Sequence, residues 1–472
     1  MKLQLAHAAP RAGQPLAAPP KLASGDWLAA ATLAASNLLI FGWGAGRLGF
    51  YYDDGGWMSS LPSAGLRGLW TITRNYVPGR NLHVLLQYAI YKLAGDPAAH
   101  LAQLHLIQSA VDGLAAAAFF LLLRRLLVPA TAALLAAGLF SFWPIHGETH
   151  FWLPATPQNQ LTTLFVIAFC WTTLEMIRSQ RGFSARRWWL ALLDAGVFLF
   201  ALFTYDQVLF VLALLIAGRV ATAILRRWSD RWRFASIHLF YLAAIALYAW
   251  VKLRIVPGKA PSLTPDAWRL LHENILGTLA STFGKPWLLH VAPFFQTVTS
   301  TDWVLAAVAA LALAAVAIAL LPRVHAPRPS VFVLLLALLF YIAAYLPIWL
   351  WYISPRHHYL PSLGLFATGG VGLGWLLKCI RFRVIQLFLV LLFGAGTCFF
   401  AAADRGESRT WETSFTAKKQ LFAEIRPDLE GKNVLALDEF PLSLGSAYLI
   451  LPHDALFGPG LFYGRSFSLP PG

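Results

Sequence analysis

The sequence contains about eleven apolar runs, each roughly 17 to 25 residues long, which is the length that a helix needs to cross the hydrocarbon core of a bilayer. Within lipid, a spanning segment must satisfy its own backbone hydrogen bonds, so such runs form helices. The expected spans are residues 27–47, 100–123, 129–146, 157–177, 188–205, 207–225, 235–256, 303–321, 330–352, 361–378 and 384–402. The sequence therefore predicts an all-α polytopic membrane protein with about eleven transmembrane helices.

The composition agrees with this class. Hydrophobic residues make up 58% of the chain and charged residues only 12%, which leaves too little polar surface for a soluble protein of 472 residues. The net charge of +15 does not indicate a nucleic-acid partner, because the basic residues lie between apolar runs and form no groove-like cluster. The three cysteines lie in or beside apolar runs and predict no disulfide framework.

Basic residues follow alternate apolar runs and indicate how the chain is oriented. The connections after the second, fourth, sixth, eighth and tenth runs hold almost no Asp or Glu, which marks them as cytoplasmic. Their basic residues are Arg124, Arg125, Arg178, Arg181, Arg186, Arg187, Arg226, Arg227, Arg231, Arg233, Arg323, Arg328, Lys378, Arg381 and Arg383. We therefore expect the amino terminus inside, and the carboxyl terminus and the longer polar loops outside.

Three regions follow from this topology. Residues 1–26 predict a disordered cytoplasmic lead without a cleavable signal peptide, and residues 27–402 predict the transmembrane domain. Residues 403–472 predict a small extracytoplasmic cap, in which residues 434–437 are a candidate strand.

The two long outer loops, 48–99 and 257–302, each contain an amphipathic stretch, at 81–94 and 264–283. Both stretches predict helices lying in the membrane interface. In the first, an apolar face of Leu82, Leu85, Leu86, Ala89, Ile90 and Leu93 is distinct from a face of His83, Gln87 and Tyr91.

The first candidate site is the pair Asp53-Asp54, directly outside the first span. Adjacent carboxylates repel each other, so a site that keeps them together must gain something from their charge. They are suited to deprotonating or orienting an acceptor hydroxyl, or to binding a divalent cation. The alternative is a solvated loop in which an Asp caps a helix.

The second candidate is the segment His146-Gly147-Glu148-Thr149-His150, at the outer end of the third span. Two imidazoles and a carboxylate are metal ligands in many proteins, but this spacing matches no firm zinc signature. A catalytic or acceptor-binding role for Glu148 is the preferred interpretation.

The third candidate is Arg356-His357-His358-Tyr359, between the ninth and tenth spans. The planar guanidinium of Arg356 suits the oxygens of a lipid phosphate. The alternative is an interfacial arginine that extends toward lipid headgroups.

Polar residues inside the spans form a further set, which serves either function or hydrogen bonding between helices. Its members are His105, Gln108 and Asp112 on one helix face, Asp194, and Tyr205-Asp206 at a tight outer turn. The sequence contains no phosphate loop of the G-x-x-x-x-G-K-[ST] type, no G-x-S-x-G segment and no nucleic-acid motif.

Three motifs together resemble the GT-C membrane glycosyltransferases that use polyprenyl-phosphate sugars, such as protein O-mannosyltransferases and aminoarabinose transferases. The resemblance covers roughly residues 27–400. The motifs are the acidic pair Asp53-Asp54, the stretch from Arg80-Asn81-Leu82-His83 to Arg124-Arg125, and Pro355-Arg356-His357-His358-Tyr359-Leu360-Pro361, which is similar to an Arg-x-x-Tyr-Leu-Pro segment. Tyr205-Asp206 stands where many relatives have Lys-Glu, which is a departure from the pattern.

The resemblance implies that an acceptor hydroxyl attacks the anomeric carbon of a lipid-linked sugar with inversion. Asp53, Asp54 and Glu148 would then be catalytic, and Arg356 and Tyr359 would bind the donor phosphate. Other implied substrate-site residues are Arg80, His83, His146, His150, Asp206, His357 and His358. A divalent cation is the one cofactor left open, with no metal ligands assigned.

The expected function is sugar transfer from a polyprenyl-phosphate donor to an extracytoplasmic glycan, lipid or protein, in a bacterial inner membrane. Three alternatives remain. One is a surface-polysaccharide polymerase or ligase that uses a lipid-diphosphate donor. The second is a secondary transporter or flippase, a class in which inverted repeats and broken helices near the midplane are common. The third is a catalytically inactive scaffold that keeps the fold.

Overall fold

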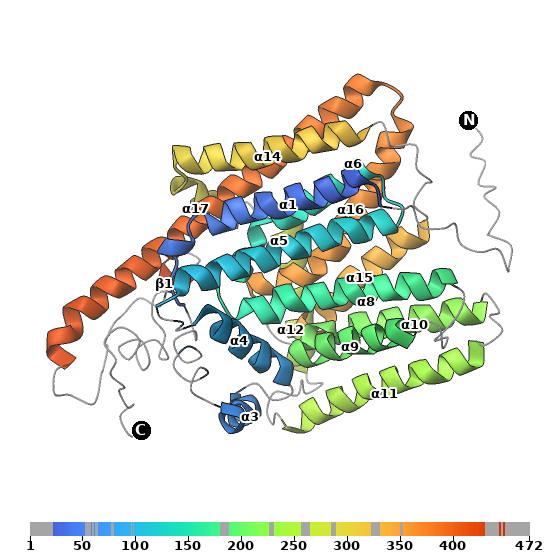
Figure 1. The fold of residues 1–472 in the computed structure, drawn as a ribbon, viewed down its shortest axis with the longest axis horizontal. Helices are drawn as coiled ribbons and strands as arrows, with labels where there is room; N and C mark the ends of the chain where they lie inside the picture. Colours follow the sequence, from blue (N-terminus) through green and yellow to red (C-terminus); the bar gives the residue numbers. More distant parts are fainter. Residues whose placement is uncertain are drawn as a thin grey trace.

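The computed structural model describes residues 22–51, 58, 61, 65–76, 80–95, 97, 99–179, 188–225, 231–255, 265–284, 289–321, 331–349, 353–429, 443–444 and 447–448. Nearly all of these residues are helical. The longer helices run side by side as one bundle (Figure 1). Two strands of two residues each, β1 (Ser443–Leu444) and β2 (Ala447–Tyr448), pair antiparallel.

Nine helical segments among the described residues are long and apolar enough to cross a membrane. They contain α1 (Ser24–Gly42), α5 (Leu101–Arg125), α6 (Ala130–Ser141), α8 (Thr162–Ser179), α10 (Leu209–Leu225), α14 (Ser300–Leu320), α15 (Val331–Trp349), α16 (Tyr359–Cys379) and α17 (Arg383–Leu429). Two shorter apolar stretches lie in α9 (Trp188–Thr204) and α11 (Arg231–Ile255). The all-α polytopic class is confirmed, while the count of eleven spans stays a prediction.

Small residues bring the central helices close together. α1 packs against α5, and α15 against α16. A Cβ atom at Gly113 of α5 would lie 3.0 Å from the carbonyl oxygen of Ala34 in α1, and one at Gly364 of α16 would lie 2.6 Å from that of Ala337 in α15. Helices in membranes associate through such close backbone approaches, because lipid provides no hydrophobic driving force between them.

Local sequence signals explain where several helices begin. Thr299 precedes α14 and accepts a hydrogen bond from the backbone of Asp302 (3.3 Å), while the carboxylate of Asp302 accepts one from the backbone of Thr299 (3.0 Å). This reciprocal capping satisfies backbone groups that have no partner within the helix. Pro129 precedes α6, where the lack of an N–H costs nothing.

The loop helix α4 (Asn81–Ala94) is polar on the inside and apolar on the outside. His83, Gln87 and Tyr91 are at most 2% exposed, whereas Leu93 is 78% exposed. This arrangement fits a helix whose apolar face contacts lipid while its polar face covers the bundle. The helix α12 (Pro265–Phe283) is similar, since Thr278 is buried and Trp268 is exposed.

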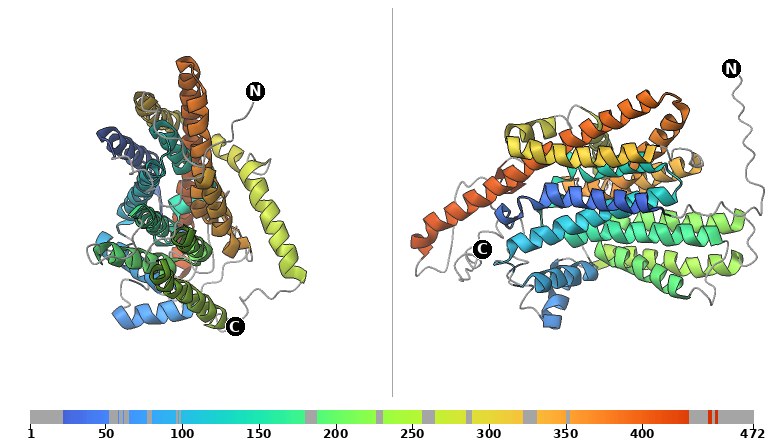
Figure 2. Two further views of the ribbon diagram at one scale, coloured as in Figure 1. Left: turned by 90° about the vertical axis from the view of Figure 1, so that its right-hand side faces the viewer. Right: turned by 45° about the horizontal axis from the view of Figure 1, so that its top comes forward.

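The last long helix continues beyond the end that we predicted for it. α17 is continuous over 47 residues, about 70 Å at about 1.5 Å per residue, so the chain stays helical past residue 402. Its carboxyl-terminal half extends past the neighbouring helices (Figures 1 and 2). Polar contacts hold this half in place: Arg405 meets Asp302 of α14 (3.1 Å), and Glu412 meets Arg47 (2.7 Å). The candidate strand at 434–437 lies outside the described residues.

Candidate functional site

Two of the three candidate segments lie side by side. After α6 the chain forms the short helices η2 (Pro144–His146) and α7 (Gly147–Phe151), and after α15 it forms η8 (Pro355–His358) before α16. A proline is the first residue of both η2 and η8, where its fixed φ angle favours a helical turn. η8 contacts both η2 and α7, so the His146–His150 segment and the Arg356–Tyr359 segment form one site.

An ion pair joins the two segments. The Nη1 atom of Arg356 lies 2.6 Å from Oε2 of Glu148, and the side chains are 8% and 6% exposed. The guanidinium also lies over the ring of Trp152, 4.6 Å from its centroid, and Asn159 donates a hydrogen bond to the carbonyl of Arg356 (2.8 Å). Arg356 is therefore buried and paired, which contradicts the alternative of an arginine extended toward lipid headgroups.

A cavity of about 330 Å³ lies near this pair, with Pro355, which precedes Arg356 in the chain, in its wall. Its walls include Ile145 of η2, residues 353–355 and His358, and one face of α12. Burial lowers the pKa of His290 in the cavity wall, and the negative charge of Glu148 opposes this shift. Glu148 is therefore within electrostatic reach of the cavity.

Asp112 of α5 lies in a buried cluster deeper in the bundle. Its carboxylate accepts hydrogen bonds from the amide of Asn37 (2.7 Å) and from the hydroxyl of Tyr359, and it lies 3.2 Å from Nδ1 of His150. The Asn37 amide also donates to Ser141 (2.8 Å). We predicted that Tyr359 binds the donor phosphate, whereas in the structure its hydroxyl donates a hydrogen bond to Asp112.

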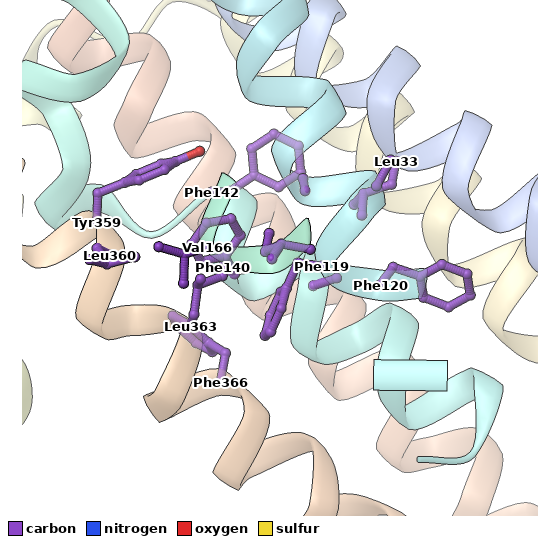
Figure 3. Close-up of a cluster of buried hydrophobic side chains, with 14 of the residues drawn as sticks. Leu33, Phe119, Phe120, Phe140, Phe142, Val166, Tyr359, Leu360, Leu363 and Phe366 are labelled. Carbon is purple, nitrogen blue, oxygen red and sulfur yellow. The ribbon is translucent and has the colours of Figure 1, made fainter. Parts of the chain in front are cut away.

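An apolar layer adjoins the Asp112 cluster. Figure 3 shows Tyr359 with Phe140, Leu363 and Phe366 in this layer. The ring centroid of Tyr359 lies 5.1 Å from that of Phe140 and 4.9 Å from that of His146. Tyr359 therefore links the polar cluster to the hydrophobic core.

Besides His150, two buried ionisable side chains next to this cluster have no hydrogen-bond partner among the described residues. They are His146, at both ring nitrogens, and Asp404 of α17, at both carboxylate oxygens. Both residues are fully buried. The carboxylate of Glu407, one turn after Asp404, packs against Gly147, where any side chain would collide with it.

Arg80, His83 and Asp206 form a separate cluster. Asp206 lies 3.0 Å from Arg80 and 3.1 Å from Lys252 of α11, and it accepts a hydrogen bond from Tyr248 (2.6 Å). Burial lowers the pKa of Arg80, but Asp206, Tyr205 and Tyr248 together outweigh this effect, so the pKa is raised. Burial, and then the positive charge of Arg80, lower the pKa of His83 to about 3.

Aromatic contacts connect the Asp206 cluster to η8. The guanidinium of Arg80 lies 4.8 Å from the ring centroid of Tyr205, and that ring stacks on His357 at 6.3 Å. Gln207 donates a hydrogen bond to the carbonyl of His357 (2.8 Å). The residue before Asp206 is Tyr205 and not a lysine. Lys252 of α11 nevertheless places a cation next to Asp206.

Asp53 and Asp54 lie outside the described residues. Tyr51, two residues before Asp53, is buried and donates a hydrogen bond to the carbonyl of Trp411 in α17 (2.8 Å). Lys418 donates to the carbonyl of Phe50 (3.0 Å). The segment leading to the acidic pair is therefore fixed against α17.

Sequence reasoning missed several of these polar residues. Asp404, Glu407, Ser408 and Trp411 follow the helical spacing of three and four residues, which was the available signal. Asn274 and His290, which line the cavity of about 330 Å³, were also not among the predicted site residues. In the part of the chain that the structure describes, no group of three or more His, Cys, Asp or Glu side chains is placed to hold a metal ion.

Comparisons with protein-family models, with curated proteins and with solved structures found no match for this chain.

Proposed function

We propose that the chain is an integral membrane glycosyltransferase, which transfers a sugar from a polyprenyl-phosphate donor to a glycan, lipid or protein outside the cytoplasm. The observation that carries the proposal is the buried Glu148–Arg356 pair near a cavity whose wall includes Pro355 and His358 of the same short helix as Arg356. This pair provides a carboxylate and a guanidinium within a few ångströms of each other, next to a space that is open to a substrate.

In the proposed reaction, the oxygen of an acceptor hydroxyl forms a bond to the anomeric carbon of the donor sugar. The bond from that carbon to the phosphate oxygen breaks, and the phosphate leaves with the electron pair. Glu148, or a carboxylate of Asp53-Asp54, accepts the hydroxyl proton. Arg356 stabilises the charge on the leaving phosphate. The phosphate would either bind Arg356 together with Glu148 or replace Glu148 as the partner of Arg356.

The finer topology belongs to the same proposal. We infer eleven spans, an amino terminus in the cytoplasm, and the cavity and carboxyl terminus on the outer face of a bacterial inner membrane. The distribution of basic residues in alternate connections supports this orientation.

The proposal is tested with purified protein in nanodiscs, a panel of radiolabelled polyprenyl-phosphate sugars, and the variants Glu148→Gln and Arg356→Ala. We expect each variant to lose at least about 100-fold in transfer rate, the usual cost of removing a charge-stabilising or proton-accepting group. Glu175→Gln is the matched control, because Glu175 pairs with Arg125 at 3.4 Å in another part of the bundle.

Two outcomes would count against the proposal. Folded protein that leaves every monophosphate donor intact but consumes a lipid-diphosphate donor would instead identify a polymerase or ligase. Loss of transfer in Glu175→Gln equal to that in Glu148→Gln would show that the Glu148–Arg356 pair is not specifically required.

A transporter or flippase is the second candidate, and one observation favours it. His146 and Asp404 are buried without hydrogen-bond partners among the described residues, and ionisable groups within spans often belong to ion or proton pathways. Movement of an intact lipid-linked sugar across proteoliposome membranes, driven by a pH gradient and without bond cleavage, would support this function in place of transfer.

A further inference from the structure

The cavity near the Glu148–Arg356 pair combines apolar residues with polar residues that are neither Asp, Glu, Lys nor Arg. The polar side chains in its wall are Asn274 and Ser281 of α12, His290, Ser354 and His358. Hydroxyls, amides and neutral imidazoles each contain both a donor and an acceptor of hydrogen bonds. Sugar hydroxyls have the same dual character, so this wall is suited to a polyhydroxylated ligand.

Other contacts determine the positions of these polar groups. The amide of Asn274 donates to the carbonyl of Trp349 (2.9 Å), and the hydroxyl of Ser281 donates to the backbone carbonyl of Thr278 (3.0 Å). His358 is hydrogen-bonded to Tyr345 through Nδ1 (2.6 Å). A wall whose side chains are already oriented binds a polar ligand without first ordering them.

The described part of the wall contains no Asp, Glu, Lys or Arg. Arg356, which follows Pro355 of the wall in the chain, has its charge paired with that of Glu148 at 2.6 Å. A ligand that brings a charge into a partly enclosed site loses hydration, and an unpaired charge there is costly. The volume of about 330 Å³ equals that of about eleven waters at about 30 Å³ each, which accommodates one sugar ring.

We propose that this cavity binds the sugar of the donor and selects uncharged sugars over those that carry an amino or a carboxylate group. The identity of the ligand as a donor sugar rests on the proposed function. The selectivity rests on the cavity wall alone.

The experiment compares three donors with the same polyprenyl phosphate: a neutral hexose, an amino sugar and a uronic acid. We expect the neutral donor to have a kcat/KM at least about tenfold above both charged donors, because the wall offers no partner for their charge. Comparable values for the amino sugar or the uronic acid would overturn the selectivity and leave glycosyl transfer standing.

A pair of variants on α12 tests whether the wall causes the selectivity. Ser281→Asp adds a carboxylate to the cavity and should shift the ratio of amino-sugar to neutral-sugar kcat/KM upward by about tenfold. Ser281→Asn is the matched control, since it has nearly the same size without the charge, and it should leave the ratio unchanged. Equal ratios in both variants would overturn the assignment of the sugar to this cavity.

Equilibrium binding of the three donors to the wild-type protein, measured without an acceptor, separates the two hypotheses. If no donor is transferred by the wild-type protein, the proposed function fails. Preferential binding of the neutral donor, weakened by Ser281→Asp, would then still support the cavity's selectivity. Equal binding of all three donors, or no binding, would overturn it.

Discussion

Two buried ion pairs in this bundle differ in their surroundings. The Asp194–Arg219 pair is bidentate, at 2.8 and 2.7 Å, and Thr173 accepts further hydrogen bonds from Arg219. Tyr241 donates to Asp194 (3.2 Å), and the ring of Phe169 packs against the guanidinium at 4.0 Å. This pair connects α8, α9, α10 and α11, and the cavity of about 550 Å³ between α10 and α11 has a mostly apolar wall.

The Glu148–Arg356 pair lies near a cavity with several polar side chains in its wall, and its neighbourhood contains His146 and Asp404 without hydrogen-bond partners among the described residues. Fully satisfied polar networks stabilise one arrangement of a fold, whereas unsatisfied buried groups cost stability and need another reason to be there. We infer that the Asp194–Arg219 pair holds the helices together and that the Glu148–Arg356 pair serves function.

The largest stability effect should follow from breaking the Asp194–Arg219 pair. Arg219→Met leaves Asp194 buried without its cation, which should reduce the free energy of unfolding by about 3–5 kcal/mol. Thermal unfolding in detergent measures this loss. Glu148→Gln also removes the partner of a buried charge, but its amide oxygen can still accept a hydrogen bond from Arg356, so it should lose less. Equal melting temperatures for Arg219→Met and the wild type would remove the basis of the comparison.

The next effect concerns pH and the cluster around Arg80. Because the pKa of His83 is lowered to about 3 in the folded protein, protonation below its ordinary value of 6.5 favours the unfolded state. Above pH 6.5, His83 is neutral in both the folded and the unfolded state, so its protonation costs no stability. As the pH decreases from 6.5 toward 3, the free energy of unfolding decreases. At pH 5 the loss should be about 2 kcal/mol. His83→Gln should remove this part of the pH dependence, as pH-dependent melting curves would reveal.

If the melting temperature of His83→Gln falls as steeply between pH 6.5 and 5 as that of the wild type, other groups cause the pH dependence. The Asp206 pair cannot produce it in this range, because Asp206 and Arg80 both stay charged there. The comparison would then extend to the other buried histidines.

The sequence was informative about the helices and less so about the pairs. Apolar length predicted the spans, and the two faces of residues 81–94 predicted α4, because both patterns are local. Glu148 and Arg356 are separated by 208 residues, so their pairing depends on how α6 and α16 pack. The end of α17 was missed because hydropathy decreases after Ala403, while ion pairs with Asp302 and Arg47 keep the polar part packed on the bundle.

A partly exposed ion pair should contribute the least to stability of the pairs compared. Arg125 and Glu175 lie 3.4 Å apart with side chains 21% and 29% exposed, and pairs of this kind contribute about 0–1 kcal/mol. Arg125→Met should therefore change the melting temperature much less than Arg219→Met. A loss as large as that of Arg219→Met would mean that burial does not distinguish these pairs.

His146→Phe should have the smallest effect on stability and sharpens the comparison most. His146 makes no hydrogen bond to the described residues and packs against the rings of Phe140 and Tyr359, with centroids 5.6 and 4.9 Å away. An apolar ring should be tolerated there within about 1 kcal/mol, and it removes a buried polar group that lacks a partner. We expect the melting temperature to stay the same or rise while sugar transfer falls at least tenfold. Because the substitution removes no hydrogen bond to the described residues, such a fall would show that the imidazole itself is needed for transfer. Unchanged transfer would show that His146 serves only packing in the core.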